Sequence, residues 1–156
     1  MSEPYEEVVA GEYWLRFPPG ERHEAICERL HSHVAASLVD VPGARRLPPR
    51  EAVRVKPDTV LRPDLAIIDP DTGQLWLAAE VISANDHRPD TVAKKALYEE
   101  LNVPRLWIVD PRYDNVEVYE RGEYGLALTR ILAVRDRLTE ERLPRLQIVL
   151  TELFVD

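Results

Sequence analysis

Two strand-like runs joined by a turn are the feature that most constrains the fold. Residues 61–68 and 75–82 are rich in aliphatic side chains, and residues 69–73 read Asp-Pro-Asp-Thr-Gly, the composition of a short hairpin loop. Pairing the runs across this loop sets Asp64 directly opposite Glu80, with Cβ atoms roughly 4.5–5.5 Å apart. The hairpin therefore predicts two carboxylates side by side on one face of a sheet.

Alternation along the two runs predicts what surrounds this acid pair. The shared face is expected to carry Arg62, Ala66, Ile68, Trp76, Ala78 and Ile82. Two carboxylates among apolar neighbours are costly unless a cation compensates them. Arg62, a lysine from another element or a divalent metal could supply the charge, and oxygen ligands of this kind suit Mg²⁺ or Mn²⁺.

A helix predicted over residues 90–101 offers such a lysine. Asp90, Lys94 and Tyr98 fall at i, i+4 and i+8 and form one polar stripe. If the helix packs beside the second strand, the Lys94 ammonium can reach the acid pair, although alone it could equally form an i, i+4 ion pair with Asp90. Lys95 is the alternative, but it points about 100° away from the stripe.

The order of elements along the rest of the chain predicts the fold class. Strands are expected over residues 12–17, 52–55, 106–109, 116–119, 126–132 and 143–150, and an amphipathic helix over residues 21–38. Strand, helix, strands, helix and strands in this order predict an α/β fold with a mixed central sheet. The length of 156 residues predicts one domain over residues 1–156.

Composition excludes several classes of protein. The 28 acidic residues exceed the 20 basic ones and give a net charge of -8, which argues against a surface coated with basic residues. Cys27, the one cysteine, excludes an internal disulfide or a Cys-based zinc site, and its position on an apolar stripe predicts an inert core thiol. The acidic N-terminus and the lack of a long apolar run predict a cytoplasmic protein without membrane contact.

One local stretch is nevertheless basic. Residues 41–63 carry a local charge of +4 through Arg45, Arg46, Arg50, Arg54, Lys56 and Arg62, against Glu51 and Asp58. These side chains could contact nucleic-acid phosphates. The other interpretation is a solvated loop that pairs with the acidic remainder of the chain.

Several of these motifs together resemble a known family. They are Arg62-Pro63-Asp64, Glu80-Val81-Ile82-Ser83, Asp90 with Lys94 and Tyr98, and Trp107-Ile108-Val109-Asp110-Pro111. In combination they are similar to the Uma-two-type family of restriction endonucleases, within the PD-(D/E)XK phosphodiesterase superfamily. Gly11-Glu12, His23, Leu143-Pro144 and Leu153-Phe154 extend the resemblance along the chain.

The resemblance implies a restriction-endonuclease-like mixed sheet flanked by helices, with additional hairpins, and metal-dependent cleavage of nucleic acid, with DNA as the expected substrate. Asp64, Glu80 and the main-chain carbonyl of Val81 would hold Mg²⁺ or Mn²⁺, and Lys94 would stabilise negative charge or position water. Ile82 departs from the superfamily, which usually has a lysine there; the resembling family carries it on the next helix.

Two further points stay open at this level. His23, Glu24 or Glu28 of the first helix could face the metal, or His23 could only lie near the helix start, and Asp90 and Tyr98 could support the site. A homodimer is expected because cutting both strands needs two sites. The alternative is a catalytically inactive nuclease-fold module that binds nucleic acid or protein, which the acidic net charge and Ile82 favour.

Overall fold

A mixed sheet forms the centre of the molecule. The computed structural model describes residues 4–16, 20–83 and 88–155, with only the backbone described for residues 88–90. The central sheet has the order β10-β9-β8-β7-β6-β3. Its strands are β3 (Arg45–Arg46), β6 (Leu65–Ile68), β7 (Leu75–Val81), β8 (Arg105–Asp110), β9 (Asn115–Gly122) and β10 (Gly125–Leu132). Neighbours are antiparallel except β7 and β8, which run parallel.

Two smaller sheets and three helices complete the described part of the chain. The four-stranded sheet has the order β2-β1-β5-β4, and β11 pairs with β12. The bounds are β1 (Tyr5–Val9), β2 (Glu12–Arg16), β4 (Val53–Lys56), β5 (Thr59–Leu61), β11 (Arg137–Glu140), β12 (Leu143–Val149), α1 (Glu21–Ser37), α2 (Arg88–Glu100) and α3 (Leu150–Leu153). These observations confirm the predicted α/β class with a mixed sheet and added hairpins. No described helix is both long and apolar enough to cross a bilayer.

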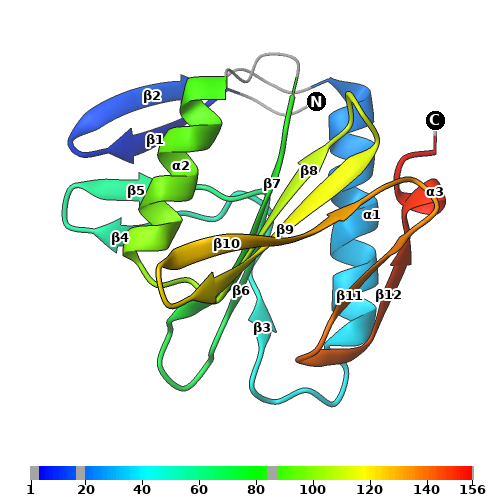
Figure 1. Cartoon of the computed structure of the whole chain (residues 1–156). Helices are drawn as coiled ribbons and strands as arrows, with labels where there is room; N and C mark the ends of the chain where they lie inside the picture. The colour runs from blue at the N-terminus through cyan, green and yellow to red at the C-terminus, as the bar shows by residue number, and fades with distance from the viewer. Residues whose placement is uncertain (1–3, 17–19, 84–87, 156) are drawn as a thin grey trace.

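The two long helices lie on opposite faces of the central sheet. α1 packs on one face together with β12 and α3, while α2 lies on the other face, next to the four-stranded sheet (Figure 1). Ile26, Leu30 and Val34 of α1 share a fully buried core with Leu65 and Leu77. Tyr98 of α2 belongs to the second core, on the opposite face. Elements on both faces can therefore reach the ends of β6 and β7.

The register of the β6–β7 hairpin agrees with the prediction. Leu65 pairs with Ala79 and Ala66 with Ala78, and continuing this register brings Asp64 to Glu80. Asp64 itself directly precedes β6. Asp64 and Glu80 therefore face each other across the hairpin, as predicted.

The other end of the hairpin differs from the prediction. A β-bulge lies between Ile67 and Ile68, because Ile67 pairs with Leu77 whereas Ile68 pairs with Leu75. One extra residue on β7 reverses the alternation from that point. Trp76 therefore packs in the α1-side core, and its expected place on the Ala78 face is wrong.

The predicted strand over residues 61–68 is two strands in different sheets. Leu61 ends β5 of the four-stranded sheet, and β6 of the central sheet begins at Leu65. Pro63 lies between them and lacks the N–H that a continuous ladder needs. The chain crosses from one sheet to the other at Arg62-Pro63-Asp64, which carries the first acidic residue of the candidate site.

Candidate active site

The Asp64 carboxylate lies where β6 and β7 separate. Its Oδ2 atom accepts a hydrogen bond from the Val81 N–H at 2.8 Å, so the side chain continues the ladder beyond the first residue of β6. The Val81 carbonyl in turn accepts a 2.7 Å hydrogen bond from Nε2 of His23, on α1. His23 Nε2 also lies 3.8 Å from Asp64 Oδ2. One carboxylate and one imidazole side chain therefore bind the main-chain groups of Val81 at the end of the hairpin.

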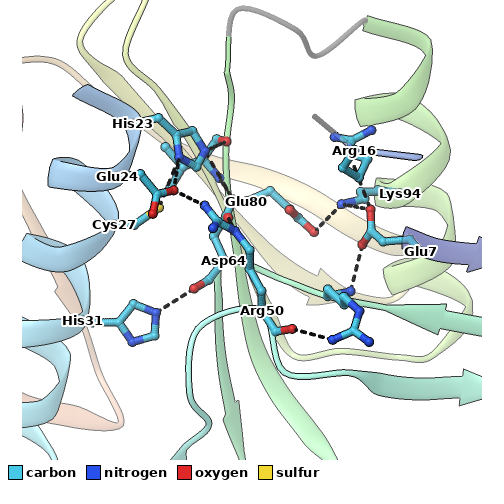
Figure 2. Close-up of polar contacts among 12 residues, drawn as sticks. Glu7, Arg16, His23, Glu24, Cys27, His31, Arg50, Asp64, Glu80 and Lys94 are labelled. Carbon is cyan, nitrogen blue, oxygen red and sulfur yellow. Dashed lines mark hydrogen bonds and ion pairs between the residues drawn. The ribbon is translucent and has the colours of Figure 1, made fainter. Parts of the chain in front are cut away.

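A second group of side chains surrounds Glu80. Lys94 Nζ lies 3.1 Å from Glu80 Oε1, and the Tyr98 hydroxyl donates to the same oxygen at 2.7 Å. The lysine also lies 2.8 Å from Oε1 of Glu7, a residue of β1. Figure 2 shows the ammonium between the two carboxylates. The predicted approach of Lys94 and Tyr98 to Glu80 is therefore present.

Glu7 is a site residue that the sequence analysis missed. Its side chain is 0% exposed, and Oε2 accepts a 2.8 Å hydrogen bond from the Arg62 N–H. Arg16 Nε lies 3.7 Å from its other oxygen. No motif marks Glu7, and an acidic residue in an acidic segment does not indicate burial; its inward position on β1 is seen only in the structure.

Arg50 is the cation on the Asp64 side. Its Nε atom lies 3.3 Å from Asp64 Oδ1, and its Nη2 atom pairs with Glu24 of α1 (Figure 2). Below it, His31 Nε2 donates to the Asp64 carbonyl at 2.6 Å while its Nδ1 accepts from Arg46 at 2.7 Å. Burial lowers the pKa of His31, in keeping with a neutral ring. Arg50 and Arg46 therefore face the site.

Burial and neighbouring charge change the acid–base properties of the Glu80 side. Burial, strengthened by Glu7 and Asp64, raises the pKa of Glu80 to about 7 although Lys94 and Tyr98 oppose the change. Burial acts to lower the pKa of Lys94, but Glu80 and Glu7 outweigh it and raise that pKa above its ordinary value. Burial and the adjacent Glu80 also raise the pKa of Tyr98. At neutral pH the lysine is charged and the tyrosine neutral.

The α1 side also brings together softer donor atoms, so the single cysteine does not by itself exclude a zinc site with mixed donors, contrary to the expectation from the sequence. Donor atoms of His23, Cys27 and Asp64 lie within 4.8 Å of one another, and Cys27 Sγ is 3.6 Å from His23 Nδ1. Cys27 is buried in the core, as expected, and burial raises the pKa of its thiol. The thiol is therefore neutral, which makes this group a weaker match for a cation than the carboxylates.

The oxygen donors fit a hard divalent cation. Asp64 and Glu80 supply two carboxylates, and the Val81 carbonyl lies beside them, which is the kind of donor set that Mg²⁺ and Mn²⁺ take. Asp64 also borders a cavity of about 390 Å³ lined by Glu24, Cys27 and Arg50. Each of the three donor groups contacts a protein donor here, so a cation would have to share or displace those contacts.

Several other predicted residues lie away from the acid pair. Lys95 pairs with Glu99 and lies over the Tyr119 ring, as its direction on the helix predicts. Glu28 is exposed and lines the same cavity as Asp64. The side chain of Asp90 lies outside the described residues.

The six basic residues of the 41–63 stretch do not form one surface. Arg46 and Arg50 turn inward, as described above, and Arg62 donates to the carbonyls of Glu6 and Arg50. Lys56 pairs with Glu100 and Arg54 donates to the Pro57 carbonyl. Arg45 is exposed on the edge strand β3. Neither a phosphate-contacting surface nor a solvated loop accounts for the inward contacts of Arg46 and Arg50.

Comparison with known proteins identifies the family. The Uma2 family model, described as "Putative restriction endonuclease", matches residues 2–151. A crystal structure of "a putative nuclease belonging to DUF820" from Anabaena variabilis is similar, with a TM-score of 0.80, 17% identity and coverage of 98% of this chain and 91% of that one. No curated protein matched the chain. At this identity the likeness to the crystal structure shows the fold, whereas the family model spans nearly the whole sequence: the chain belongs to the Uma2 family of restriction-endonuclease-like proteins.

Proposed function

We propose that this protein is an endonuclease that hydrolyses phosphodiester bonds of DNA with Mg²⁺ or Mn²⁺. The observation that carries the proposal is the contact of Lys94 with Glu80, which faces Asp64 across one hairpin on a nuclease-like fold. Asp64, Glu80 and the Val81 carbonyl would hold the cation. The bound cation would polarise a phosphoryl oxygen and lower the pKa of a bound water.

The protein's own side chains have separate roles in this mechanism. The charged Lys94 ammonium donates to the phosphate as negative charge develops in the transition state. Tyr98 orients Glu80 through its hydroxyl, and the Val81 N–H orients Asp64. His23 fixes the direction of the Val81 carbonyl from α1. These contacts pre-arrange the oxygen donors, which reduces the cost of ordering them when the cation binds.

Removal of either carboxylate tests the proposal. With purified protein and plasmid DNA, D64N and E80Q should each lower Mg²⁺- or Mn²⁺-dependent cleavage by about 10²-fold or more. E123Q is the matched control, because Glu123 is an exposed acid in the turn between β9 and β10 and should leave the rate unchanged. Metal-dependent cleavage that survives both substitutions would refute the assignment of these carboxylates.

The identity of the cation can be tested at Cys27. If the ion lies between Asp64 and Glu80, C27S should leave Mn²⁺ binding and cleavage unchanged, because sulfur is not a donor to that site. A cation held by His23, Cys27 and Asp64 would be a softer ion such as Zn²⁺, whose affinity would fall sharply in C27S. Calorimetry with each metal separates the two sites.

The alternative is a nuclease-fold module without activity, and two observations favour it. Every proposed donor group already contacts a protein donor, and Ile82 stands at the usual lysine position. Such a module would bind no Mg²⁺ or Mn²⁺ in calorimetry, and its DNA affinity would be unchanged by EDTA.

We further propose that the chain acts as one domain and that two copies cooperate. Cleavage of both DNA strands requires two centres, and the part of the chain that the structure describes offers one such acid pair. Light scattering coupled to size exclusion should give twice the mass of the chain, and a plasmid assay should yield linear as well as nicked DNA. A monomer that only nicks would contradict the dimer.

A further inference from the structure

We propose that Glu7 is the positioning residue for Lys94: it holds the ammonium beside the centre and balances its charge when a divalent cation binds Glu80. The inference rests on the proposed nuclease function and assigns a role to a residue that no motif identified. Within the described residues, Glu7 is the only buried carboxylate of β1, and it contacts α2 through Lys94.

The geometry places one ammonium between two carboxylates from different sheets. Lys94 Nζ is 2.8 Å from Glu7 Oε1 and 3.1 Å from Glu80 Oε1. Glu80 belongs to the central sheet and Glu7 to the four-stranded sheet. Lys94 therefore has a second carboxylate partner whose position is independent of the hairpin that carries the acid pair.

Glu7 is itself held in place. Its Oε2 atom accepts from the main-chain N–H of Arg62, two residues before Asp64, and Arg16 lies beyond its Oε1 atom at 3.7 Å. A main-chain donor cannot turn away as a side chain can, so this bond fixes the carboxylate relative to the crossing that carries Asp64. β1 also pairs with β5 through Val8 and Val60, which ties the strand to the same segment.

Charge balance explains why a second carboxylate is needed. A divalent cation and the Lys94 ammonium compete for Glu80, and Lys94 is only 5% exposed. A buried charge left without a partner is strongly destabilising. With Glu7 at 2.8 Å, Lys94 can release Glu80 to the cation and still keep a counter-charge. The ammonium then remains next to the bound phosphate instead of blocking the cation's ligand.

A double-mutant cycle measured by Mn²⁺ calorimetry tests this role. E7Q should weaken Mn²⁺ binding about tenfold, because Lys94 is left with Glu80 alone and competes harder for it. K94M should bind Mn²⁺ more tightly than the wild type. In the K94M background, E7Q should weaken binding only about twofold, since the competing ammonium is gone.

The control variants separate positioning from folding. E6Q changes an exposed acid on the same strand and should leave Mn²⁺ affinity unchanged. Glutamine keeps an oxygen that can accept from the Arg62 N–H, so E7Q is expected to fold. E7D keeps the charge on a shorter side chain and should restore part of the lost Mn²⁺ affinity. If E7Q does not fold, the Mn²⁺ affinity of E7D is measured in its place.

The possible outcomes separate the role of Glu7 from the nuclease proposal. Unchanged Mn²⁺ affinity in E7Q, or equal weakening in the wild-type and K94M backgrounds, would overturn the role of Glu7 while leaving the nuclease proposal intact. A wild-type protein that binds no Mn²⁺ would overturn both. A larger effect of E7Q in the wild type than in K94M supports the inference.

Discussion

The two carboxylates of the acid pair are held in different ways. Asp64 accepts from a main-chain N–H and pairs with Arg50, which comes from a loop. Glu80 contacts Lys94 and Tyr98, two side chains one turn apart on α2. The Asp64 carboxylate is thus held by a main-chain donor as well as by its cation, whereas the contacts of Glu80 come from side chains of α2. We therefore expect loss of Arg50 to lower stability first and loss of Lys94 to affect cleavage and cation binding first.

The largest effect is expected from the lysine on the Glu80 side. K94M should lower single-turnover DNA cleavage by about 10²–10³-fold, because the transition state loses a charged donor. K95M is the matched control, since Lys95 pairs with Glu99 instead. Equal losses in both variants, measured with the same plasmid substrate, would remove the distinction between the two lysines.

The Asp64 side should respond through stability. R50Q leaves Asp64 and Glu24 without their shared cation and should lower the free energy of unfolding by about 2 kcal/mol, roughly a 30-fold change in the folding equilibrium. R54Q, at an exposed residue that donates to a carbonyl, should cost far less. Urea unfolding of both variants measures the difference, and a similar loss in each would contradict it.

Cation binding should depend on pH through Glu80. Because burial raises its pKa to about 7, Glu80 carries a proton at pH 6 that competes with the cation. Mn²⁺ affinity should therefore fall about tenfold per pH unit below 7 and level off above it. In calorimetry E80Q should lose this slope and D64N should keep it. A slope that persists in E80Q would assign the proton to another group.

The smallest effect is expected at the Tyr98 hydroxyl. Y98F removes a 2.7 Å hydrogen bond to Glu80 and should lower the free energy of unfolding by about 1 kcal/mol, roughly a fivefold change. Y119F is the control, because its hydroxyl donates to Glu117 near the surface. Thermal unfolding measures the stability of both variants. A larger loss of stability in Y119F than in Y98F would contradict the contribution expected from the buried Tyr98–Glu80 hydrogen bond.

The parts of the site that the sequence predicted depend on local geometry. The turn after Asp69 predicts the hairpin, and the helical period places Lys94 and Tyr98 on one stripe. Both rules act over a few residues, so the pattern alone predicts that Glu80 faces Asp64 and contacts Lys94, although a bulge near the turn completes the register.

The parts that were missed depend on contacts between distant segments. Glu7 and Arg50 are charged residues in polar stretches, and only the packing of β1 beside α2 and of the 47–52 loop beside Asp64 brings them to the site. Trp76 changes face because of a bulge that the apolar pattern does not encode. Local propensity describes neither of these effects, because they arise from tertiary packing.

The place of Glu7 on β1 has a consequence for biosynthesis. Glu7 leaves the ribosome before its partner Lys94, which emerges only with α2, after both acidic residues of the hairpin. A nascent chain that stops short of α2 would hold Glu7 and Glu80 without the lysine that lies between them. The buried charge cluster can therefore close only late in translation, so an incomplete chain would lack the arrangement on which the proposed DNA cleavage depends.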